Sequence, residues 1–221
     1  MTENWAVIPV KGLTESKTRL STYLQGDRRR ILVEALLEDV LSSIIRSRVY
    51  GIVLVISPDE NVGSRILPQE VSFLKQTGVG LNRAIEQANK LATQKHARSV
   101  TTVLADIPLV EPGDFKELMS ISTAIPRIVM GPSLKGGTNL MLTSPPGVIS
   151  PSYGRWSYSK HLRLAQVKSV DAYSISNSRV SFDIDTMSDL VELRRLDPES
   201  KTASARVTSM MKMVVSPARV R

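Results

Sequence analysis

The chain of 221 residues contains no cysteine. This absence excludes thiol nucleophiles, iron–sulfur clusters, zinc ribbons and disulfide scaffolds, and it fits a reducing compartment. Aromatic residues make up only 5% of the chain, which leaves few rings for stacking on nucleic-acid bases. No apolar run approaches the roughly 18 residues of a membrane span, and the run from Trp5 to Val10 is too short for a signal-peptide core. We therefore expect a soluble, cytoplasmic protein with no membrane partner.

Acidic residues are outnumbered by basic ones, 21 against 29, for a formal net charge of +8. A basic nucleic-acid-binding module is one interpretation, and it would show a steep salt dependence of binding. However, no zinc-finger, helix-turn-helix or RNP pattern occurs, and anionic small molecules explain the charge as well. Part of the excess lies in residues 197–221, which we expect to form a basic tail, helical or flexible, after a single domain over residues 1–196. A homodimer is left open.

Strand and helix patterns alternate along the chain. We predict strands at residues 5–10, 49–56, 71–74, 99–104, 128–130, 140–143 and 180–184, and helices at 27–48, 81–94, from 112, at 157–168 and after 186. Asp27 is the expected N-cap of the first helix, and Thr186 to Asp189 fits a capping box. Nearly continuous apolar runs such as Val49–Ile56 are typical of strands covered on both faces. The alternation predicts a single three-layer α/β domain with a mostly parallel, doubly wound sheet.

Two familiar nucleotide-binding motifs are absent. Ser16-Lys17-Thr18 resembles the end of a P-loop, but that pattern needs glycine where Ser16 stands. Gly78-x-Gly80 begins like a dinucleotide fingerprint, but Arg83 replaces its third glycine. A P-loop enzyme is excluded, and a Rossmann dehydrogenase is disfavoured.

Polar residues follow the predicted strands, at the edge where open α/β sheets collect their ligands. They include Lys11, Lys17, Arg19, Gly80, Asn82, Asp106, Asp183 and Asp185. Cations, a glycine turn and separated carboxylates suit a phosphorylated substrate with a divalent metal. Asp106 is the strongest candidate for a metal or ligand role, because an acid directly after a buried strand needs partners or solvent.

Other candidates have an ordinary structural interpretation beside the functional one. Lys17 and Arg19 could be solvated loop charges, and residues 136–139 (Gly-Gly-Thr-Asn) could be a simple hairpin turn. On a regular strand, Asp183 and Asp185 would point to the same face as paired metal ligands, but helix N-terminal charge explains them equally. We expect His161, in a basic helix, to be a surface residue rather than a catalyst.

Seven short motifs occur in one order along the chain. They are Ile8-Pro-Val-Lys-Gly-Leu13, Ser16-Lys-Thr-Arg-Leu20, Gly80-Leu-Asn82, Ala105-Asp-Ile-Pro-Leu109, Gly136-Gly-Thr-Asn139, Tyr153-Gly154 with Ser157 and His161, and Asp183-Ile-Asp-Thr186 with Asp189-Leu190. Together they resemble the CofC family, the 2-phospho-L-lactate guanylyltransferases of deazaflavin coenzyme F420 biosynthesis. The resemblance covers about residues 5–196 and leaves the tail outside it.

The resemblance implies a GT-A nucleotidyltransferase fold, GTP as donor and Mg²⁺ as metal. It implies that Lys17 acts in catalysis at the triphosphate and Asp106 at the metal. The implied nucleotide-binding residues are Lys11, Lys17, Arg19, Gly80 and Asn82; the implied metal ligands are Asp106, Asp183 and Asp185; the implied acceptor-binding residues are Thr138, Gly154 and Ser157. The expected partners are GTP and a small phosphorylated acid, not nucleic acid.

The identity of the acid stays open at the level of sequence. Phosphoenolpyruvate and 3-phosphoglycerate carry a carboxylate near a phosphate, as 2-phospholactate does. Molybdenum-cofactor guanylyltransferases and sugar-phosphate nucleotidyltransferases would share the fold, but they usually open with a glycine-rich loop where this chain has Gly12 alone.

Overall fold

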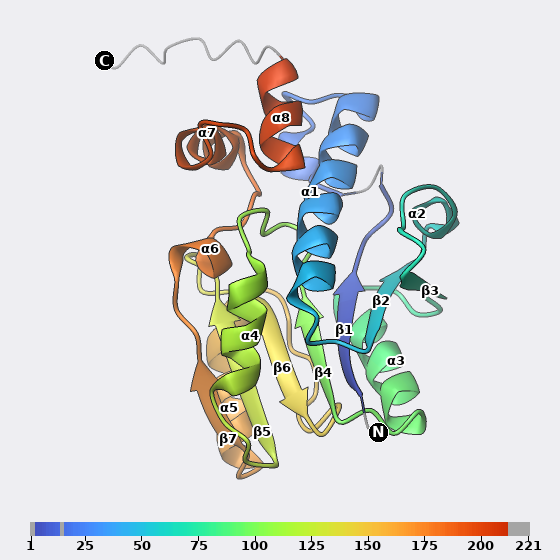
Figure 1. Ribbon diagram of the computed structural model, residues 1–221, viewed down its shortest axis with the longest axis vertical. Helices are drawn as coiled ribbons and strands as arrows, with labels where there is room; N and C mark the ends of the chain where they lie inside the picture. Colours follow the sequence, from blue (N-terminus) through green and yellow to red (C-terminus); the bar gives the residue numbers. More distant parts are fainter. Residues whose placement is uncertain (1–2, 14–15, 212–221) are drawn as a thin grey trace.

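The computed structural model describes residues 3–13 and 16–211, and its described strands form one seven-stranded sheet (Figure 1). The strand order is β3-β2-β1-β4-β6-β5-β7. The strands are β1 (Asn4–Pro9), β2 (Ile52–Ser57), β3 (Val71–Lys75), β4 (Ser99–Val103), β5 (Arg127–Pro132), β6 (Thr138–Ser144) and β7 (Asp171–Ser174). Among them, β6 alone is antiparallel to its neighbours, β4 and β5. The fold is the predicted single α/β domain with a mostly parallel sheet.

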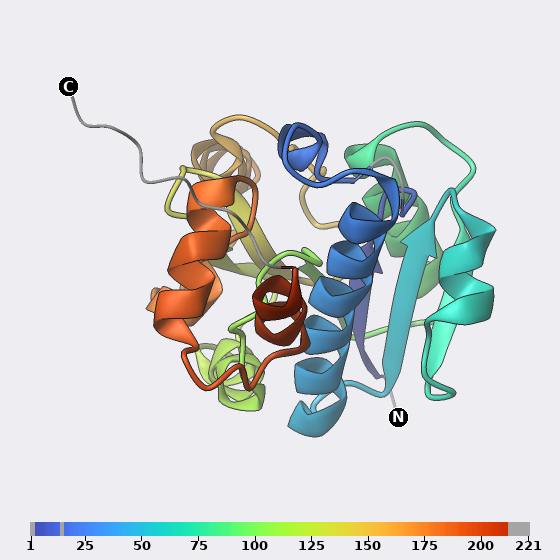
Figure 2. The same ribbon diagram turned by 90° about the horizontal axis from the view of Figure 1, so that it is seen from above.

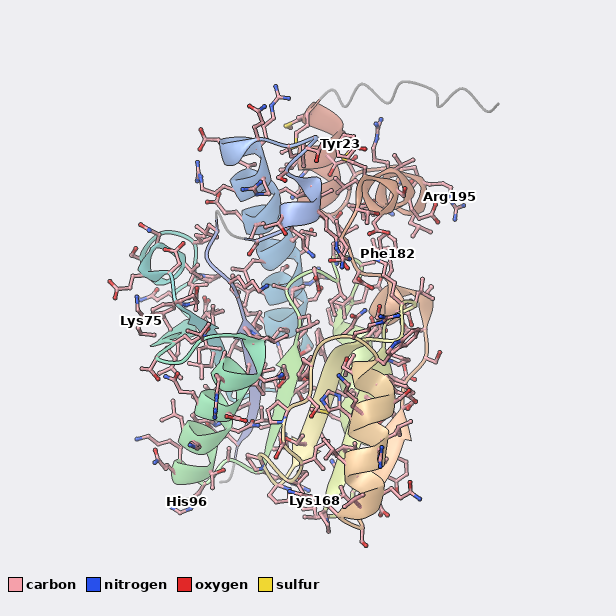
Figure 3. The ribbon with its side chains drawn as sticks, turned by 180° about the vertical axis from the view of Figure 1, so that it is seen from behind. Tyr23, Lys75, His96, Lys168, Phe182 and Arg195 are labelled. Carbon is pink, nitrogen blue, oxygen red and sulfur yellow. The ribbon has the colours of Figure 1, made fainter. Side chains whose placement is uncertain are left out.

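Helices cover both faces of this sheet, so the molecule has three layers (Figures 1 and 3). The helices are α1 (Gly26–Ser47), α2 (Glu60–Arg65), α3 (Leu81–Gln94), α4 (Pro112–Ser120), α5 (Ser157–Val167), α6 (Ser178–Ser181), α7 (Met187–Leu196) and α8 (Ala203–Met210). Helices α1 and α4 lie on one face, and α3 and α5 lie on the other.

The two-sided burial of the sheet explains the continuous apolar runs. Along β1, Ala6 and Ile8 enter the core on the α1 side, whereas Trp5 and Val7 pack with the buried alanines of α3. Because successive side chains of a strand point to opposite faces, a strand between two helical layers needs apolar residues at every position. This arrangement confirms the interpretation of the runs as strands covered on both faces.

Two details of the expected secondary structure are wrong. Val180–Ile184 is not a strand: a short helix, α6, ends at Ser181, and residues 182–185 do not pair with the sheet. Val180 and Ile184 are nevertheless fully buried, which accounts for the strand-like pattern. The N-cap of α1 is Gln25 rather than Asp27, which lies in the first turn. The predicted capping box of Thr186 and Asp189 is present at α7.

Helices α7 and α8 follow the sheet in sequence. Helix α8 packs against α1, and α7 packs on the other side of α8 (Figure 2). The carboxylate of Asp39 in α1 accepts hydrogen bonds from the amides of Ala203 (2.6 Å) and Ser204 (3.0 Å), which begin α8. Ala205 is fully buried in the same cluster as Leu32 and Leu36 of α1. The first part of the expected tail is therefore packed onto the fold, and residues 212–221 of that tail lie outside the described residues.

The parallel strands β1, β2 and β4 end toward α7 and α8 (Figure 1). Phe182, which precedes the Asp183–Asp185 segment, lies toward this end of the molecule, and His96 and Lys168 lie at the opposite end (Figure 3). The polar residues that follow the strands are thus gathered at one edge of the sheet, as the fold class predicts. No helix within residues 3–13 and 16–211 has the length and apolarity needed to cross a membrane.

Candidate active site

The ammonium group of Lys17 lies between two carboxylates at the carboxyl ends of the strands. Its Nζ is 2.6 Å from Asp106 Oδ2 and 3.1 Å from Asp185 Oδ1. Arg19 lies at the edge of this group, with its guanidinium 3.9 Å from Asp185 Oδ2. The structure therefore brings together a cation and two carboxylates that the sequence predicted separately.

Burial and charge act in opposite directions on Lys17. Burial lowers the pKa of its ammonium, but the carboxylates of Asp106 and Asp185 outweigh burial and raise the pKa above its ordinary value. Lys17 is therefore charged at neutral pH. The backbone of Lys17 has a φ of 55° at the start of the short 3₁₀ turn Thr18–Leu20, a left-handed conformation that is uncommon for a residue with a side chain.

A second ammonium group, that of Lys135, lies on the other side of the acidic segment. Its Nζ is 3.2 Å from Asp183 Oδ2, 3.5 Å from Asp185 Oδ2 and 3.0 Å from Asp189 Oδ2. Sequence reasoning missed Lys135, although it directly precedes the Gly136-Gly137 pair. Its proximity to the acids depends on the turn between β5 and β6, which places residue 135 against a segment 48 residues away.

The two acids of the Asp183–Asp185 segment have different environments. Asp183 is buried and accepts a 2.6 Å hydrogen bond from the Ser133 hydroxyl. Burial raises the pKa of the Asp183 carboxyl despite this bond. At Asp185, burial also acts to raise the pKa, but Lys17 and then Lys135 lower it below the ordinary value. Asp185 is thus the more firmly ionised of the two.

A glycine turn joins the acidic cluster to a pair of buried hydroxyls. An added Cβ at Gly137 would lie 3.4 Å from Cβ of Ser133, which binds Asp183, and 3.9 Å from Ser157 Oγ. Gly136 has a φ of +78°, and an added Cβ there would come within 2.6 Å of the Trp156 ring. Only glycine fits at position 136, because both the backbone conformation and the indole exclude a side chain.

The predicted acceptor residues Thr138 and Ser157 contact each other. The Ser157 hydroxyl donates to Thr138 Oγ1 at 3.2 Å, and both residues are almost completely buried. Thr138 Oγ1 also lies 3.1 Å from Nδ1 of His161. The expectation that His161 is a surface residue is wrong, because the side of α5 that carries it packs against the sheet and leaves it 0% exposed. Gly154 is exposed in the loop before α5.

Asn82 ties this loop to the start of α3. Its amide nitrogen donates to the Tyr153 carbonyl at 3.3 Å, and its oxygen accepts from the Tyr153 amide at 2.8 Å. Gly80, with a φ of +94°, precedes α3. A predicted nucleotide-binding residue therefore positions the loop that carries Gly154. Lys11 is exposed just after β1, and the ion pairs above do not include it.

The fit of a metal ion depends on Asp106 and Asp185. The described residues contain no group of three acidic, histidine or cysteine side chains arranged to hold a metal. However, Asp106 Oδ1 is buried without a hydrogen-bond partner. Mg²⁺ is commonly held by one or two carboxylates, with substrate phosphates and water completing its shell. The donor set therefore fits a divalent ion that arrives with a phosphorylated substrate.

Comparisons with known proteins identify the family of this chain. The family described as "Guanylyl transferase CofC like" matches residues 4–219. The expectation that the family pattern ends near residue 196 is therefore wrong, because the match continues through residues 197–219 of the expected tail. A phosphoenolpyruvate guanylyltransferase of Rubrobacter xylanophilus is 34% identical over 86% of this chain and 92% of its own length. A 2-phospho-L-lactate guanylyltransferase of Methanocaldococcus vulcanius is 31% identical over 85% of this chain and 82% of its own.

A similar fold occurs in solved structures. A protein of Desulfovibrio desulfuricans G20, described as a nucleotide-diphospho-sugar transferase, superposes with a TM-score of 0.79 at 19% identity and covers 95% of each chain. The expected nucleotidyltransferase fold is thereby confirmed. The site itself combines the cations of Lys17 and Lys135, the carboxylates of Asp106, Asp183 and Asp185, and a glycine turn next to buried hydroxyls.

Proposed function

This chain belongs to the family of CofC-like guanylyl transferases, and on that premise we propose that it joins GTP to 2-phospho-L-lactate in coenzyme F420 biosynthesis. The phosphate of the acid attacks the α-phosphorus of GTP, a phosphoanhydride forms, and pyrophosphate leaves. The product is lactyl-2-diphospho-5'-guanosine. The observation that carries the proposal is the Lys17 ammonium between Asp106 and Asp185 at the ligand-binding edge of the sheet.

The nucleophile of this reaction is a phosphate oxygen, which is already ionised near neutral pH because the second pKa of a phosphate monoester is about 6. No general base has to remove a proton from it. This requirement suits a site built from lysines and carboxylates, in a chain with two histidines and no cysteine.

The main obstacle is the repulsion between two polyanions. Two unit charges about 4 Å apart repel by roughly 4 kcal/mol at an effective dielectric constant of about 20. Lys17 and Lys135, both charged, and the nearby Arg19 would offset this repulsion and stabilise the negative charge that gathers around the reacting phosphorus.

We propose that Mg²⁺ is held by Asp106 and Asp185, with Asp183 beside them. When bound, the ion would polarise the phosphate oxygens of GTP as a Lewis acid. Lys17 contacts the same two carboxylates, so it would turn toward the triphosphate as the nucleotide enters. Lys11, Arg19, Gly80 and Asn82 complete the proposed nucleotide half of the site.

The proposed acceptor half consists of Thr138, Gly154 and Ser157. Gly137 lies between the Ser133 that holds Asp183 and the Ser157 hydroxyl. A phosphate held near Ser157 would thus be next to the acidic cluster. Backbone amides around the exposed Gly154 can approach an anion closely, because glycine has no side chain to obstruct it.

Phosphoenolpyruvate is the second candidate acceptor, favoured by the name of the Rubrobacter relative at 34% identity. The deciding experiment measures pyrophosphate release with GTP and Mg²⁺ and with 2-phospho-L-lactate, phosphoenolpyruvate or 3-phosphoglycerate in turn, and identifies each product by mass. A kcat/KM for 2-phospho-L-lactate at least tenfold above the others supports the proposal. A higher kcat/KM for another acid reassigns the acceptor, and ATP used as well as GTP contradicts guanylyl specificity.

A further inference from the structure

His161 forms a buried contact that the proposed reaction does not use. Its ring is 0% exposed and packs edge-on against Tyr153, with the ring centroids 4.9 Å apart and the planes at 67°. Both ring nitrogens have partners: the amide of Ser152 lies 2.9 Å from Nε2, and Thr138 Oγ1 lies 3.1 Å from Nδ1. The imidazole therefore connects the loop before α5 to a residue proposed to bind the acceptor.

These contacts determine where the proton of the ring must be. A backbone amide can only donate, so Nε2 accepts the bond from Ser152 and carries no proton. A neutral imidazole has one protonated nitrogen, which here must be Nδ1, and it donates to Thr138 Oγ1. Burial, followed by the charge of the adjacent Lys160, lowers the pKa of His161 to about 4, so the ring is neutral at physiological pH.

The orientation of the Thr138 hydroxyl follows in the same way from its hydrogen-bond donors and acceptors. A hydroxyl oxygen accepts two hydrogen bonds and donates one. Thr138 Oγ1 accepts one bond from His161 Nδ1 and one from the Ser157 hydroxyl at 3.2 Å. With both acceptor positions filled, Thr138 has only its own proton left to offer. A hydroxyl constrained in this way is a donor, which is what an anionic oxygen requires.

We propose that His161 is a positioning residue that fixes the Thr138 hydroxyl as a hydrogen-bond donor to an anionic oxygen of the phosphorylated acid. The same ring anchors the Ser152 amide, and with it the loop that carries Gly154. His161 does not touch the substrate and transfers no proton in the reaction. The identity of the anion rests on the proposed function, whereas the protonation state of the ring does not.

The first test measures directly which ring nitrogen of His161 carries the proton. The chain has two histidines, His96 and His161, so a ¹⁵N-histidine spectrum of the whole protein has two ring systems, and loss of one in His161→Gln assigns it. The inference predicts a neutral ring protonated on Nδ1 for His161 at pH 7. A ring protonated on Nε2, or on both nitrogens, would overturn the inference whether or not the enzyme is active.

The second test separates the two bonds of the ring. The amide nitrogen in His161→Asn is as many bonds from Cβ as Nδ1 and can still donate to Thr138, whereas the amide oxygen in His161→Gln matches Nε2 and can only replace the contact to Ser152. His161→Gln leaves Thr138 without the bond that fixes it as a donor to the anionic oxygen. Loss of that Thr138 hydrogen bond to a charged group should raise the KM for the acceptor by roughly ten- to a hundredfold. His161→Asn should raise it less than about threefold, and neither should change the KM for GTP.

Two controls distinguish positioning from general destabilisation. Ala165→Gly weakens the same helix at a buried site without removing a bond to Thr138, and it should leave the KM for the acceptor unchanged. In a Thr138→Val background, His161→Gln should have no further effect on that KM. The inference would be overturned if the Asn and Gln variants raised the KM for the acceptor equally. It would also be overturned if His161→Gln raised that KM as much in the Thr138→Val background as in the wild type. A wild-type enzyme that releases no pyrophosphate with any acceptor would instead overturn the proposed function.

Discussion

Lys17 and Asp106, which are 89 residues apart in sequence, form an ion pair of 2.6 Å between Nζ and Oδ2. The lysine follows β1 and the aspartate follows β4, and these strands are neighbours in the sheet. Their adjacency, and not their spacing in sequence, brings the two charges together. The backbone bond from the Ile184 amide to the Asp106 carbonyl, at 3.0 Å, adds the Asp183–Asp185 segment to the same place.

We predict that Asp106→Asn abolishes turnover while the thermal midpoint changes little. The substitution keeps the shape of the side chain, and Lys17 retains Asp185 as a partner. The loss of one carboxylate charge removes a proposed metal ligand. Steady-state rates across a Mg²⁺ titration, with a parallel thermal melt, check this prediction. Normal activity at ordinary Mg²⁺ concentrations would refute the assignment of Asp106.

We predict that Thr138→Val and Ser157→Ala each weaken use of the acceptor by roughly ten- to over a hundredfold. A hydrogen bond to a charged group contributes about 1.5–3 kcal/mol. Thr138→Val removes the proposed donor itself, and Ser157→Ala removes the hydroxyl that donates to Thr138 Oγ1 and helps to fix that donor. Nucleotide affinity should hardly move. Calorimetry of GTP binding beside acceptor kinetics checks this prediction. Lost GTP binding with unchanged acceptor dependence would assign both residues to the nucleotide half of the site.

We predict that His161 makes folding less favourable as pH falls from about 6.5 to about 4. Its pKa is lowered to about 4 in the folded protein, mainly by burial. In this interval the unfolded chain binds a proton that the folded protein does not, so the free energy of unfolding decreases as pH falls. The full loss is on the order of 3 kcal/mol, at about 1.4 kcal/mol per pKa unit.

Other groups titrate in the same interval, so this pH effect is measured as a difference. The pKa values of Asp39 and Asp183 are raised, chiefly by burial, and these acids act in the opposite direction. The free energy of unfolding is measured by denaturant for the wild type and for His161→Gln, at pH 7 and at pH 4.5. The contribution of these acids is the same in both proteins and cancels in the difference between them. An identical pH dependence in both proteins would show that His161 does not titrate as stated.

We predict that Asp39→Ala lowers the free energy of unfolding by about 1–3 kcal/mol, the cost of leaving buried amides unpaired. Asp39 accepts from the Ala203 and Ser204 amides and so attaches α8 to α1. Asp27→Ala is the matched control in the same helix, because the Asp27 side chain is 88% exposed. It should change stability by less than about 0.5 kcal/mol. Equal changes in the free energy of unfolding for the two variants would show that Asp39 does not cap α8.

The parts of the fold that could be predicted are those set by local pattern. The nearly continuous apolar run at Val49–Ile56 indicated a buried strand, which the structure has at Ile52–Ser57. The alternation of such runs with helices indicated the layers. Val180–Ile184 was mispredicted because its apolar residues are buried as in a strand, yet they pack against the core around α1 and α7 without joining the sheet. A run of apolar residues indicates that a segment is buried, but it does not indicate whether that segment pairs with a strand of the sheet.

The site was predictable where it depends on strand ends and not where it depends on turns. Lys17 and Asp106 follow from their places after β1 and β4. Asp185 was expected at the end of a strand over residues 180–184, which the structure does not form. Lys135 could not be inferred, because its contact with Asp189 requires the conformation of the turn between β5 and β6. The burial of His161 depends on which side of α5 packs against the sheet, and a helix with several basic residues leaves that choice open.

The most direct test of guanylyl transfer follows the phosphorus atoms of GTP. The enzyme is incubated with Mg²⁺, 2-phospho-L-lactate and GTP labelled at either the α- or the γ-phosphorus, and the products are separated. The account predicts that the α-label appears in the acid–guanosine diphosphate product and the γ-label in pyrophosphate, both only when the acceptor is present. A γ-label on the acid, or its release as inorganic phosphate, would contradict the account.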